Sequence, residues 1–329
     1  MNARSGTLPL SDLFGPVRLE LERINRELVE DLRPEERDLD PLVDLAVSYR
    51  GKQLRPALVC LAGKSVGGIG DAHIEIAKIV ELLHTATLVH DDVLDGARMR
   101  RQQATVNAAY GTEVPVLLGD YIYARAFHMA VCLPDPACSR LLSETVRRIC
   151  QGEITQILHR FDYDWDEDRY YRVIADKTAS LYAAACRLGG LYSGGDAAQL
   201  DALDTFGLEL GIAFQIVDDC LDLGGDEDVV GKSLGTDLGK GKLTLPMLFL
   251  MREPDTRRRL RELMAAHEDD HAKLADLRRD FPLNDAIDAS LDAARGRVRI
   301  ARQALSVLPN TPARDAMERI ADYVLARRL

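Results

Sequence analysis

Apolar residues recur along this chain at helical rather than strand spacing. One such run consists of Val17, Leu21, Ile24 and Leu28, and another of Leu42, Leu45, Ala46 and Tyr49. This spacing places apolar side chains on one face of an α-helix, while the period-two alternation of strands is nearly absent. Short segments rich in glycine, proline and aspartate separate the runs, at residues 67–71, 133–137, 192–196 and 224–235. The pattern predicts an all-α fold, a single large bundle of about a dozen helices.

The composition fits one domain without membrane spans. At 329 residues and 47% apolar content the chain can bury a large core, and no compositional break marks a linker, so we expect a single domain over residues 1–329. Residues 252–280 carry both charge signs and predict a solvated helix hairpin. No apolar run approaches the roughly 20 residues of a transmembrane helix, and the N-terminus lacks a signal-peptide pattern. Any membrane contact is expected to be peripheral.

The charge and the cysteine content indicate which class of partner and which cellular compartment to expect. The 42 basic and 53 acidic residues give a net charge of −11, which argues against nucleic acid as a partner. The six cysteines show no close pairing and lie mostly in apolar helical patterns. We therefore expect reduced core cysteines in a cytoplasmic protein.

Two aspartate patches follow apolar helical segments at the same spacing. The stretch "HDDVLDGARMRR" (90–101) contains Asp91, Asp92 and Asp95, and "FQIVDDCLD" (214–222) contains Asp218, Asp219 and Asp222. On a helix the first and last aspartate of each patch project from one face, one turn apart. Two such helices facing one another would form a cluster of carboxylates that needs a cation. Oxygen ligands favour Mg²⁺, which keeps positions open for substrate phosphate oxygens.

Basic residues extend this hypothesis from a metal to a diphosphate. Arg100 and Arg101 follow the first patch, and guanidinium groups suit phosphate oxygens. His84 lies two helical turns before Asp91 and is able to donate a hydrogen bond to phosphate without a full charge. Further basic or hydroxyl residues occur in three other motifs: Lys52 and Arg55, Lys177 and Thr178, and Lys232, Lys240 and Lys242. There is an alternative interpretation of each feature taken alone. The basic residues would be ordinary solvated residues of loops and helices, and the acidic patches would be exposed helix ends.

Taken together, the motifs resemble those of the trans-isoprenyl diphosphate synthases, the polyprenyl synthetase family. The resemblance runs from about residue 13 to 329 and rests on "GKQLRP", "ELLHTATLVHDDVLDGARMRR", "LLGDYIYARAF", "ADKTASLYAAA", "FQIVDDCLD" and "GKSLGTDLGKGKLTLP". It implies the isoprenoid synthase fold with a deep central cavity between helices. It also implies a homodimer.

The implied activity is head-to-tail (1′-4, trans) condensation of isopentenyl diphosphate with an allylic prenyl diphosphate. The resemblance also implies about three Mg²⁺ ions per active site, which would help the allylic diphosphate to leave. By resemblance the principal metal ligands are Asp91, Asp95 and Asp218, supported by Asp92, Asp219 and Asp222. Isopentenyl diphosphate would contact Lys52, Arg55, His84 and Arg101. The allylic diphosphate would contact Arg100, Lys177, Thr178, Gln215, Lys232 and Lys242, and Lys177 is also expected to be catalytic.

The sequence departs from the family pattern beside the basic motifs. Arg50 and Gln53 stand where the family often has a glycine and a basic residue, and "RRQQATVN" lacks the usual glycine and proline. These departures concern the geometry of the substrate loops, since Lys52, Arg55 and both arginines are present.

Product length is expected to depend on Ala86 and Thr87, five and four residues before the first aspartate. By resemblance, bulky residues here stop chain growth. At about 1.5 Å per residue they lie roughly 6 to 7.5 Å below Asp91, and small side chains leave the tunnel open. We expect a C30–C50 product, with C40 favoured, and contact with the membrane for product release.

Three alternatives remain at this level. One is a short-chain farnesyl or geranylgeranyl diphosphate synthase. Another is a non-catalytic partner subunit of a heteromeric synthase, although such subunits usually lose their aspartates. A terpene cyclase fits less well, because it would carry an asparagine/serine/glutamate motif in place of the second aspartate patch.

Overall fold

The chain is almost entirely helical, which confirms the all-α prediction. The computed structural model describes residues 10–34, 36–49, 51–225, 234–266 and 270–327. Within these residues the only strands are two short ones, β1 (Met99–Arg100) and β2 (Gln103–Ala104), which pair antiparallel. The helices belong to two compact units, each built from three stretches of chain. The single-domain expectation for residues 1–329 stays a prediction.

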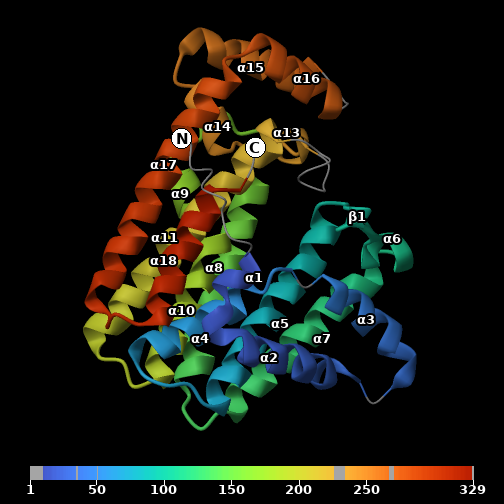
Figure 1. The fold of residues 1–329 in the computed structure, drawn as a ribbon. Helices are drawn as coiled ribbons and strands as arrows, with labels where there is room; N and C mark the ends of the chain where they lie inside the picture. Colours follow the sequence, from blue (N-terminus) through green and yellow to red (C-terminus); the bar gives the residue numbers. More distant parts are fainter. Residues whose placement is uncertain (1–9, 35, 50, 226–233, 267–269, 328–329) are drawn as a thin grey trace. The chain divides into compact units, whose positions relative to one another are not determined.

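Unit 1 comprises Met1–Glu144, Ala184–Asp204 and Leu305–Ile320. Its first stretch contains the α-helices α1 (Leu10–Leu13), α2 (Arg18–Leu32), α3 (Asp40–Ser48), α4 (Leu54–Val66), α5 (Asp71–Leu94), α6 (Val106–Tyr110) and α7 (Glu113–Cys132). It also contains the 3-10 turns η1 (Gly15–Val17) and η2 (Arg37–Leu39). Helix α5 packs against α2, α4 and α7, and these helices lie together in Figure 1.

Helix α4 forms the middle of this core. Residues 56–63 are all buried, as expected of a helix that is apolar on every side. Helix α10 (Ser180–Tyr192) approaches α4 closely at Gly189, where a Cβ atom would overlap the carbonyl oxygen of Val59. Glycine at this position therefore allows two backbones to touch.

Unit 2 comprises Thr145–Ala183, Thr205–Ala304 and Ala321–Leu329. It contains α9 (Glu167–Ile174), the π-helical turn η3 (Ala175–Ala179), α13 (Thr236–Gly239), α14 (Leu245–Leu250), α15 (Pro254–Ala266), α16 (Asp270–Asp280) and α17 (Leu283–Ala304). Helix α14 packs on α17, and α15 packs on α16 (Figure 1). The two helices α15 and α16 confirm the helices expected in residues 252–280.

Several helices contribute residues to both units. They are α8 (Ala137–Leu158), α10, α11 (Ala197–Gly224) and α18 (Pro312–Leu325), and the 3-10 turn η4 (Leu305–Val307) precedes α18.

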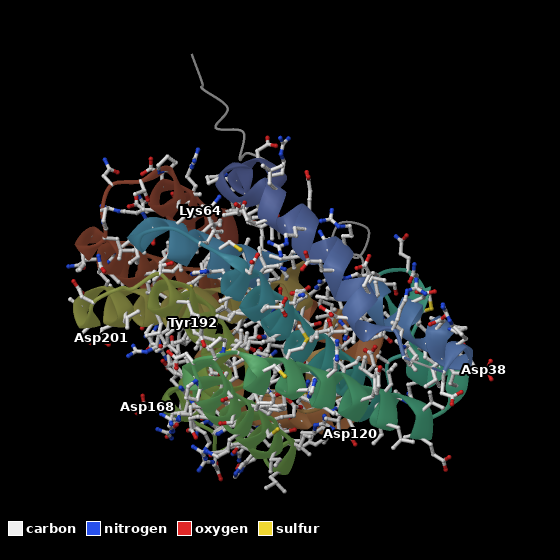
Figure 2. All side chains as sticks on the ribbon, turned by 90° about the horizontal axis from the view of Figure 1, so that it is seen from below. Asp38, Lys64, Asp120, Asp168, Tyr192 and Asp201 are labelled. Atoms are coloured by element: carbon white, nitrogen blue, oxygen red, sulfur yellow. The ribbon has the colours of Figure 1, made fainter. Side chains whose placement is uncertain are left out.

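Some of the acidic residues lie on the surface of unit 1. Asp38, Asp120 and Asp201, all in unit 1, are exposed and project from the ribbon in Figure 2. Among the cysteines, Cys60, Cys138, Cys186 and Cys220 are buried and all six are free. Cys132 and Cys150 are exposed, so the expectation of core positions is wrong for these two, which lie on the outer faces of α7 and α8. In the part of the chain that is described, no helix is both long and apolar enough to cross a bilayer.

Candidate active site

The first aspartate patch lies at the C-terminal end of α5. Asp91 and Asp92 belong to its last turn, and Asp95 follows as the C-cap residue. The backbone N–H of Asp95 donates to the carbonyl oxygen of Asp91 at 2.8 Å, so the helical spacing continues through the patch. Asp91 and Asp95 are therefore one turn apart, as the sequence spacing predicts.

Arg100 holds the middle aspartate of this patch. Its Nε lies 3.0 Å from Oδ1 and 3.2 Å from Oδ2 of Asp92, and its Nη2 lies 2.8 Å from Oδ1. Asp92 is only 1% exposed, so this pair is largely withdrawn from water. Burial opposes the charge of Arg100, but the hydrogen bond and the charge of Asp92 outweigh it and raise the arginine pKa. The guanidinium also lies over the ring of Tyr49, 5.6 Å from its centre.

The hairpin β1–β2 places Arg100 and Arg101. The two residues at its tip, Arg101 (φ 50°) and Gln102 (φ 64°), are both left-handed, as a two-residue type I′ turn requires. Glycine and asparagine adopt this conformation most easily, so this tip is strained. The guanidinium of Arg101 occupies the space beside Gly51, where a Cβ atom would overlap its Nη2. Gly51 in "GKQLRP" thus makes room for Arg101.

Three arginines of unit 1 lie around one histidine. Burial, then the positive charges of Arg55, Arg100 and Arg101, hold the pKa of His84 well below its ordinary value. Burial and the charge of Arg100 likewise lower the pKa of Arg101, while Glu81 opposes them. Arg55 lies in the first turn of α4, and the exposed Lys52 precedes that helix. His84 is therefore neutral at physiological pH, as the sequence hypothesis requires.

Gln53, one of the departures from the family pattern, has a local role. It is the N-cap of α4 in a left-handed conformation (φ 52°). Its side-chain amide pairs with that of Asn25, whose Nδ2 donates to Gln53 Oε1 at 2.8 Å, and Gln53 Nε2 donates back to Asn25 Oδ1. A two-way amide pair therefore anchors the turn that carries Lys52.

The two residues expected to influence product length differ in exposure. Ala86 is fully buried, whereas Thr87 is partly exposed and donates its hydroxyl to the carbonyl oxygen of His84 at 2.7 Å. Thr87 is therefore the one of the two whose side chain is partly exposed.

The second aspartate patch lies near the C-terminal end of α11, and its three carboxylates have different surroundings. Asp218 is the most exposed, and its Oδ1 lies 2.6 Å from Nη2 of Arg327. The guanidinium of Arg327 also lies over Phe214, 4.5 Å from the ring centre. A cation from the same unit therefore already neutralises Asp218.

Asp219 is buried and receives two hydrogen bonds. Tyr170 donates its hydroxyl to Oδ2 at 2.6 Å, and Gln215 donates its amide to Oδ1 at 2.7 Å. The hydroxyl of Thr178 in turn donates to Oε1 of Gln215 at 2.8 Å. Burial and the negative charge of Asp237 raise the Asp219 pKa to about 7, against the lowering effect of the hydrogen bonds from Tyr170 and Gln215.

Asp222 ties the glycine-rich segment to α11. It is fully buried, and its carboxylate accepts hydrogen bonds from the hydroxyl of Thr236 at 3.1 Å and the backbone N–H of Asp237 at 3.2 Å. Its carbonyl oxygen accepts the N–H of Gly235 at 2.9 Å. These contacts indicate a structural role for Asp222 at the start of α13.

Lys177 and Thr178 lie in the π-helical turn η3, a local irregularity that is frequent at functional sites. The ammonium of Lys177 forms an ion pair with Glu153 and donates to Oε1 of Gln156 at 3.1 Å. Helix α8 comes this close because Gly152 has no side chain. A Cβ atom at Gly152 would lie 2.8 Å from the backbone nitrogen of Lys177. The position of Lys177 thus depends on α8.

A small cavity of unit 2 collects these groups. Its volume is about 50 Å³. The polar residues around it are Gln156, Tyr170, Lys177, Thr178, Gln215, Asp219, Asp237, Lys242 and Thr244. The ammonium of Lys242 is almost buried, 3.3 Å from Oδ1 of Asp237. Two ammonium groups and two carboxylates around one space can bind an anion together with a cation.

Comparison with known proteins decides the family. The polyprenyl synthetase family profile matches residues 36–281. The octaprenyl diphosphate synthase of Escherichia coli is 38% identical over 312 residues, which cover 92% of this chain and 94% of the relative. The chain belongs to the polyprenyl synthetase family. It is therefore a prenyltransferase, and the resemblance drawn from its motifs is confirmed.

Solved structures of the family share its fold. A polyprenyl synthase from Caulobacter crescentus, complexed with calcium and isoprenyl diphosphate, superimposes with a TM-score of 0.89 at 32% identity, covering 98% of this chain and 99% of the other. A decaprenyl diphosphate synthase from Rhodobacter capsulatus has a TM-score of 0.88 at 33% identity and covers 98% and 100%. The isoprenoid synthase fold is thus shown for this chain.

The structure brings together only part of what the family motifs predict. Lys177, Thr178, Gln215, Asp219 and Lys242 surround one cavity, and Arg55, His84, Arg100 and Arg101 lie together in unit 1. Lys232 lies outside the described residues. That the two aspartate patches face one another stays a prediction.

Sequence reasoning missed the partners of these residues. Tyr170, Glu153 and Gln156 contact predicted site residues, and Arg327 binds Asp218. Asp237, the partner of Lys242, is the exception, because it lies within the motif "GKSLGTDLGKGKLTLP". Tyr170 had one usable signal, since it precedes Lys177 by two helical turns, whereas the others come from distant segments.

The aspartates have the chemistry of a hard-cation site. Among the described residues, no three histidine, cysteine, aspartate or glutamate side chains form a metal-binding group. The donors proposed from the sequence are carboxylate oxygens, which suit Mg²⁺ or Ca²⁺. The ion pair between Asp218 and Arg327 is an independent sign that this carboxylate attracts positive charge.

Proposed function

We propose that this family member condenses isopentenyl diphosphate with an allylic prenyl diphosphate, head to tail and in the trans configuration. We further propose that it does so as a single polyprenyl synthetase domain over residues 1–329. The observation that carries the proposal is the cavity of unit 2, which is lined by Lys177 and Lys242 together with the buried Asp219 and the partly exposed Asp237. A diphosphate needs positive groups at fixed positions, and bound divalent cations add to them.

In this proposal Lys177, Thr178, Gln215 and Lys242 bind the allylic diphosphate, together with Arg100 and Lys232. Asp91, Asp95 and Asp218 hold Mg²⁺, about three ions as the family resemblance implies, and Asp92, Asp219 and Asp222 support them. The bound metal neutralises charge that develops on the departing diphosphate. The two ammonium groups act on the same charge, because preorganised positive groups lower the barrier to its formation.

Isopentenyl diphosphate is assigned to the basic cluster of unit 1, which consists of Lys52, Arg55, His84 and Arg101. The lowered pKa of His84 supports this role. A neutral imidazole donates one hydrogen bond to a phosphate oxygen and adds no charge beside three cations. Arg101 is held at the tip of the hairpin and beside Gly51, so its guanidinium is placed before substrate arrives.

The product is proposed to be long, C30–C50 with C40 favoured. The names of two related enzymes, an octaprenyl and a decaprenyl diphosphate synthase, support this range. Ala86 and Thr87 are small, so neither of them places a bulky side chain below Asp91. A short-chain farnesyl or geranylgeranyl diphosphate synthase remains the alternative, and the assay below separates the two.

We also propose a homodimer, on the basis of α7. Its exposed residues include Leu117, Tyr121, Ala124, His128 and Val131, with Leu117 68% and Val131 65% exposed. Intervals of four and three place them on one face of the helix. An exposed apolar stripe of this kind is typical of an association surface. Sedimentation of the wild type and of Leu117→Glu tests this, and a monomeric wild type would contradict it.

The cytoplasm is the proposed compartment, with peripheral membrane contact for release of the product. Six free cysteines support a reducing compartment. Flotation of the purified protein with vesicles, with and without a long-chain prenyl diphosphate, tests the membrane contact.

One assay tests the activity and its rivals. The purified single chain is incubated with Mg²⁺, labelled isopentenyl diphosphate and, separately, geranyl, farnesyl or geranylgeranyl diphosphate, and product lengths are read by chromatography. We expect long products that disappear when EDTA is added, and Asp91→Ala and Asp218→Ala variants that lose most activity. Products that stop at C15 or C20 would favour a short-chain enzyme. No turnover by the chain alone would favour a partner subunit.

A further inference from the structure

Phe161, in the loop after α8, has an unfavourable conformation. Its φ is 62°, in the left-handed region that few bulky residues adopt. The residue is 49% exposed, although its side chain is large and apolar. The backbone conformation is therefore unfavourable for phenylalanine, and the apolar side chain is unfavourably exposed. Backbone strain of this kind persists only when contacts with the surrounding residues impose it.

The contacts that impose it come from Gly241. The backbone N–H of Phe161 donates to the carbonyl oxygen of Gly241 at 2.9 Å. The Phe161 ring fills the space beside Gly241, where a Cβ atom would lie 2.5 Å from Cδ1 and 2.6 Å from Cγ. Gly241 is itself left-handed, with φ of 68°. The ring and the peptide of Phe161 thus both hold one glycine, and no other residue would fit in its place.

Gly241 directly precedes Lys242, whose ammonium borders the cavity. The N–H of Lys242 donates to the carbonyl oxygen of Asp237 at 2.9 Å, and its ammonium lies 3.3 Å from Oδ1 of the same residue. The peptide group between Gly241 and Lys242 is therefore held at both of its polar atoms, its N–H by Asp237 and its carbonyl oxygen by Phe161.

The same part of the chain also holds the second lysine of the cavity. Glu153 and Gln156, near the end of α8, bind Lys177. Phe161 follows that helix by three residues. The end of α8 and the loop after it therefore place both ammonium groups on the cavity.

We propose that Phe161 is a positioning residue for Lys242, whose ring and backbone N–H set the Gly241 peptide so that the ammonium meets the allylic diphosphate. This inference rests on the proposed function, in which Lys242 binds that diphosphate. Removing the ring leaves the N–H contact but lets the Gly241 peptide move. The effect should appear in allylic substrate binding rather than in isopentenyl diphosphate binding, which is assigned to unit 1.

The test compares Phe161→Ala, Phe161→Tyr and Gly241→Ala with the wild type. For Phe161→Ala we expect the KM for the allylic diphosphate to rise about tenfold, with the KM for isopentenyl diphosphate and kcat within about twofold. Phe161→Tyr retains the ring and should restore the wild-type value. Gly241→Ala should imitate Phe161→Ala, because its Cβ displaces the ring. Leu158→Ala, which removes an exposed apolar side chain three residues away, is the matched control and should change nothing.

Binding of inorganic pyrophosphate by calorimetry supplies a readout without turnover. Lys242→Ala and Phe161→Ala should both weaken it. If Lys242→Ala weakens binding and the folded Phe161→Ala does not, the inference about Phe161 is overturned while the proposed function stands. If Lys242→Ala has no effect, the proposed role of the cavity is itself wrong. If Phe161→Ala does not fold, the same decision rests on Gly241→Ala.

Discussion

Replacing Asp219 by asparagine should stabilise the metal-free protein at alkaline pH. The carboxylate is 4% exposed and lies near Asp237, and its pKa is raised to about 7 from an ordinary value of 3.8. One pKa unit corresponds to about 1.4 kcal/mol, so a negative charge on Asp219 costs the folded state about 4 kcal/mol at pH 8. Asparagine has a similar shape and carries no charge, so the substitution removes this cost.

Part of the gain is lost in hydrogen bonding. Both carboxylate oxygens accept hydrogen bonds, one from Gln215 and one from Tyr170. Asparagine accepts only one of the two, which costs about 1 kcal/mol. The net gain of about 3 kcal/mol corresponds to a rise in melting temperature of about 4 °C for a chain of this length.

The gain should depend on pH with a definite sign. Because the folded pKa exceeds the unfolded one, the unfolded state loses this proton first as pH rises from about 4 to 7. The wild type therefore loses stability over that interval, and the loss is complete above pH 7. The stabilisation by Asp219→Asn should be absent near pH 4 and largest at pH 8.

Thermal melts in EDTA at pH 4.5, 6 and 8 measure this, with Asp218→Asn as the matched control. That neighbour is more exposed and is paired with Arg327, so its replacement removes an ion pair and should not stabilise the protein. The reasoning is refuted if Asp219→Asn melts at or below the wild type at pH 8, or if its gain is the same at all three pH values.

Three further changes test other parts of the site. Arg100→Gln leaves the buried Asp92 without its cation and should destabilise the protein by about 3 kcal/mol in melting experiments; a change under about 1 kcal/mol would contradict a buried pair. Arg327→Gln removes the guanidinium from Asp218, so half-maximal activity should need several-fold less Mg²⁺, and a higher requirement would show that Arg327 assists instead. Thr87→Phe fills the space beside α5 and should shorten the products seen by chromatography, whereas an unchanged length would exclude Thr87 as a determinant.

The helices and motifs of this protein were predictable because they depend on local spacing. Apolar residues three and four apart predicted α2 and α3, and an aspartate four residues after another predicted one helical face at Asp91 and Asp95. The order of the motifs was sufficient to identify the family. These features involve residues close together in the chain.

The surroundings of the aspartates were not predictable, although both patches have the same spacing. Asp92 is paired with Arg100, and Asp218 is paired with Arg327, more than 100 residues away. Asp222 instead accepts the backbone N–H of Asp237 in α13. The π-helical turn at Lys177 likewise has no signal in the spacing of its residues. These differences depend on which distant segment packs against each carboxylate.

By itself the sequence determined the helices, the order of the motifs and the chemistry they can supply, because helical spacing and side-chain type are local properties. Only the tertiary structure decided which aspartates are buried, which one is paired with Arg327, and that Phe161 packs against Gly241 beside Lys242. The physical reason is that burial and charge pairing depend on the packing of segments distant in the chain, and packing sets the pKa of Asp219 and the position of Lys242.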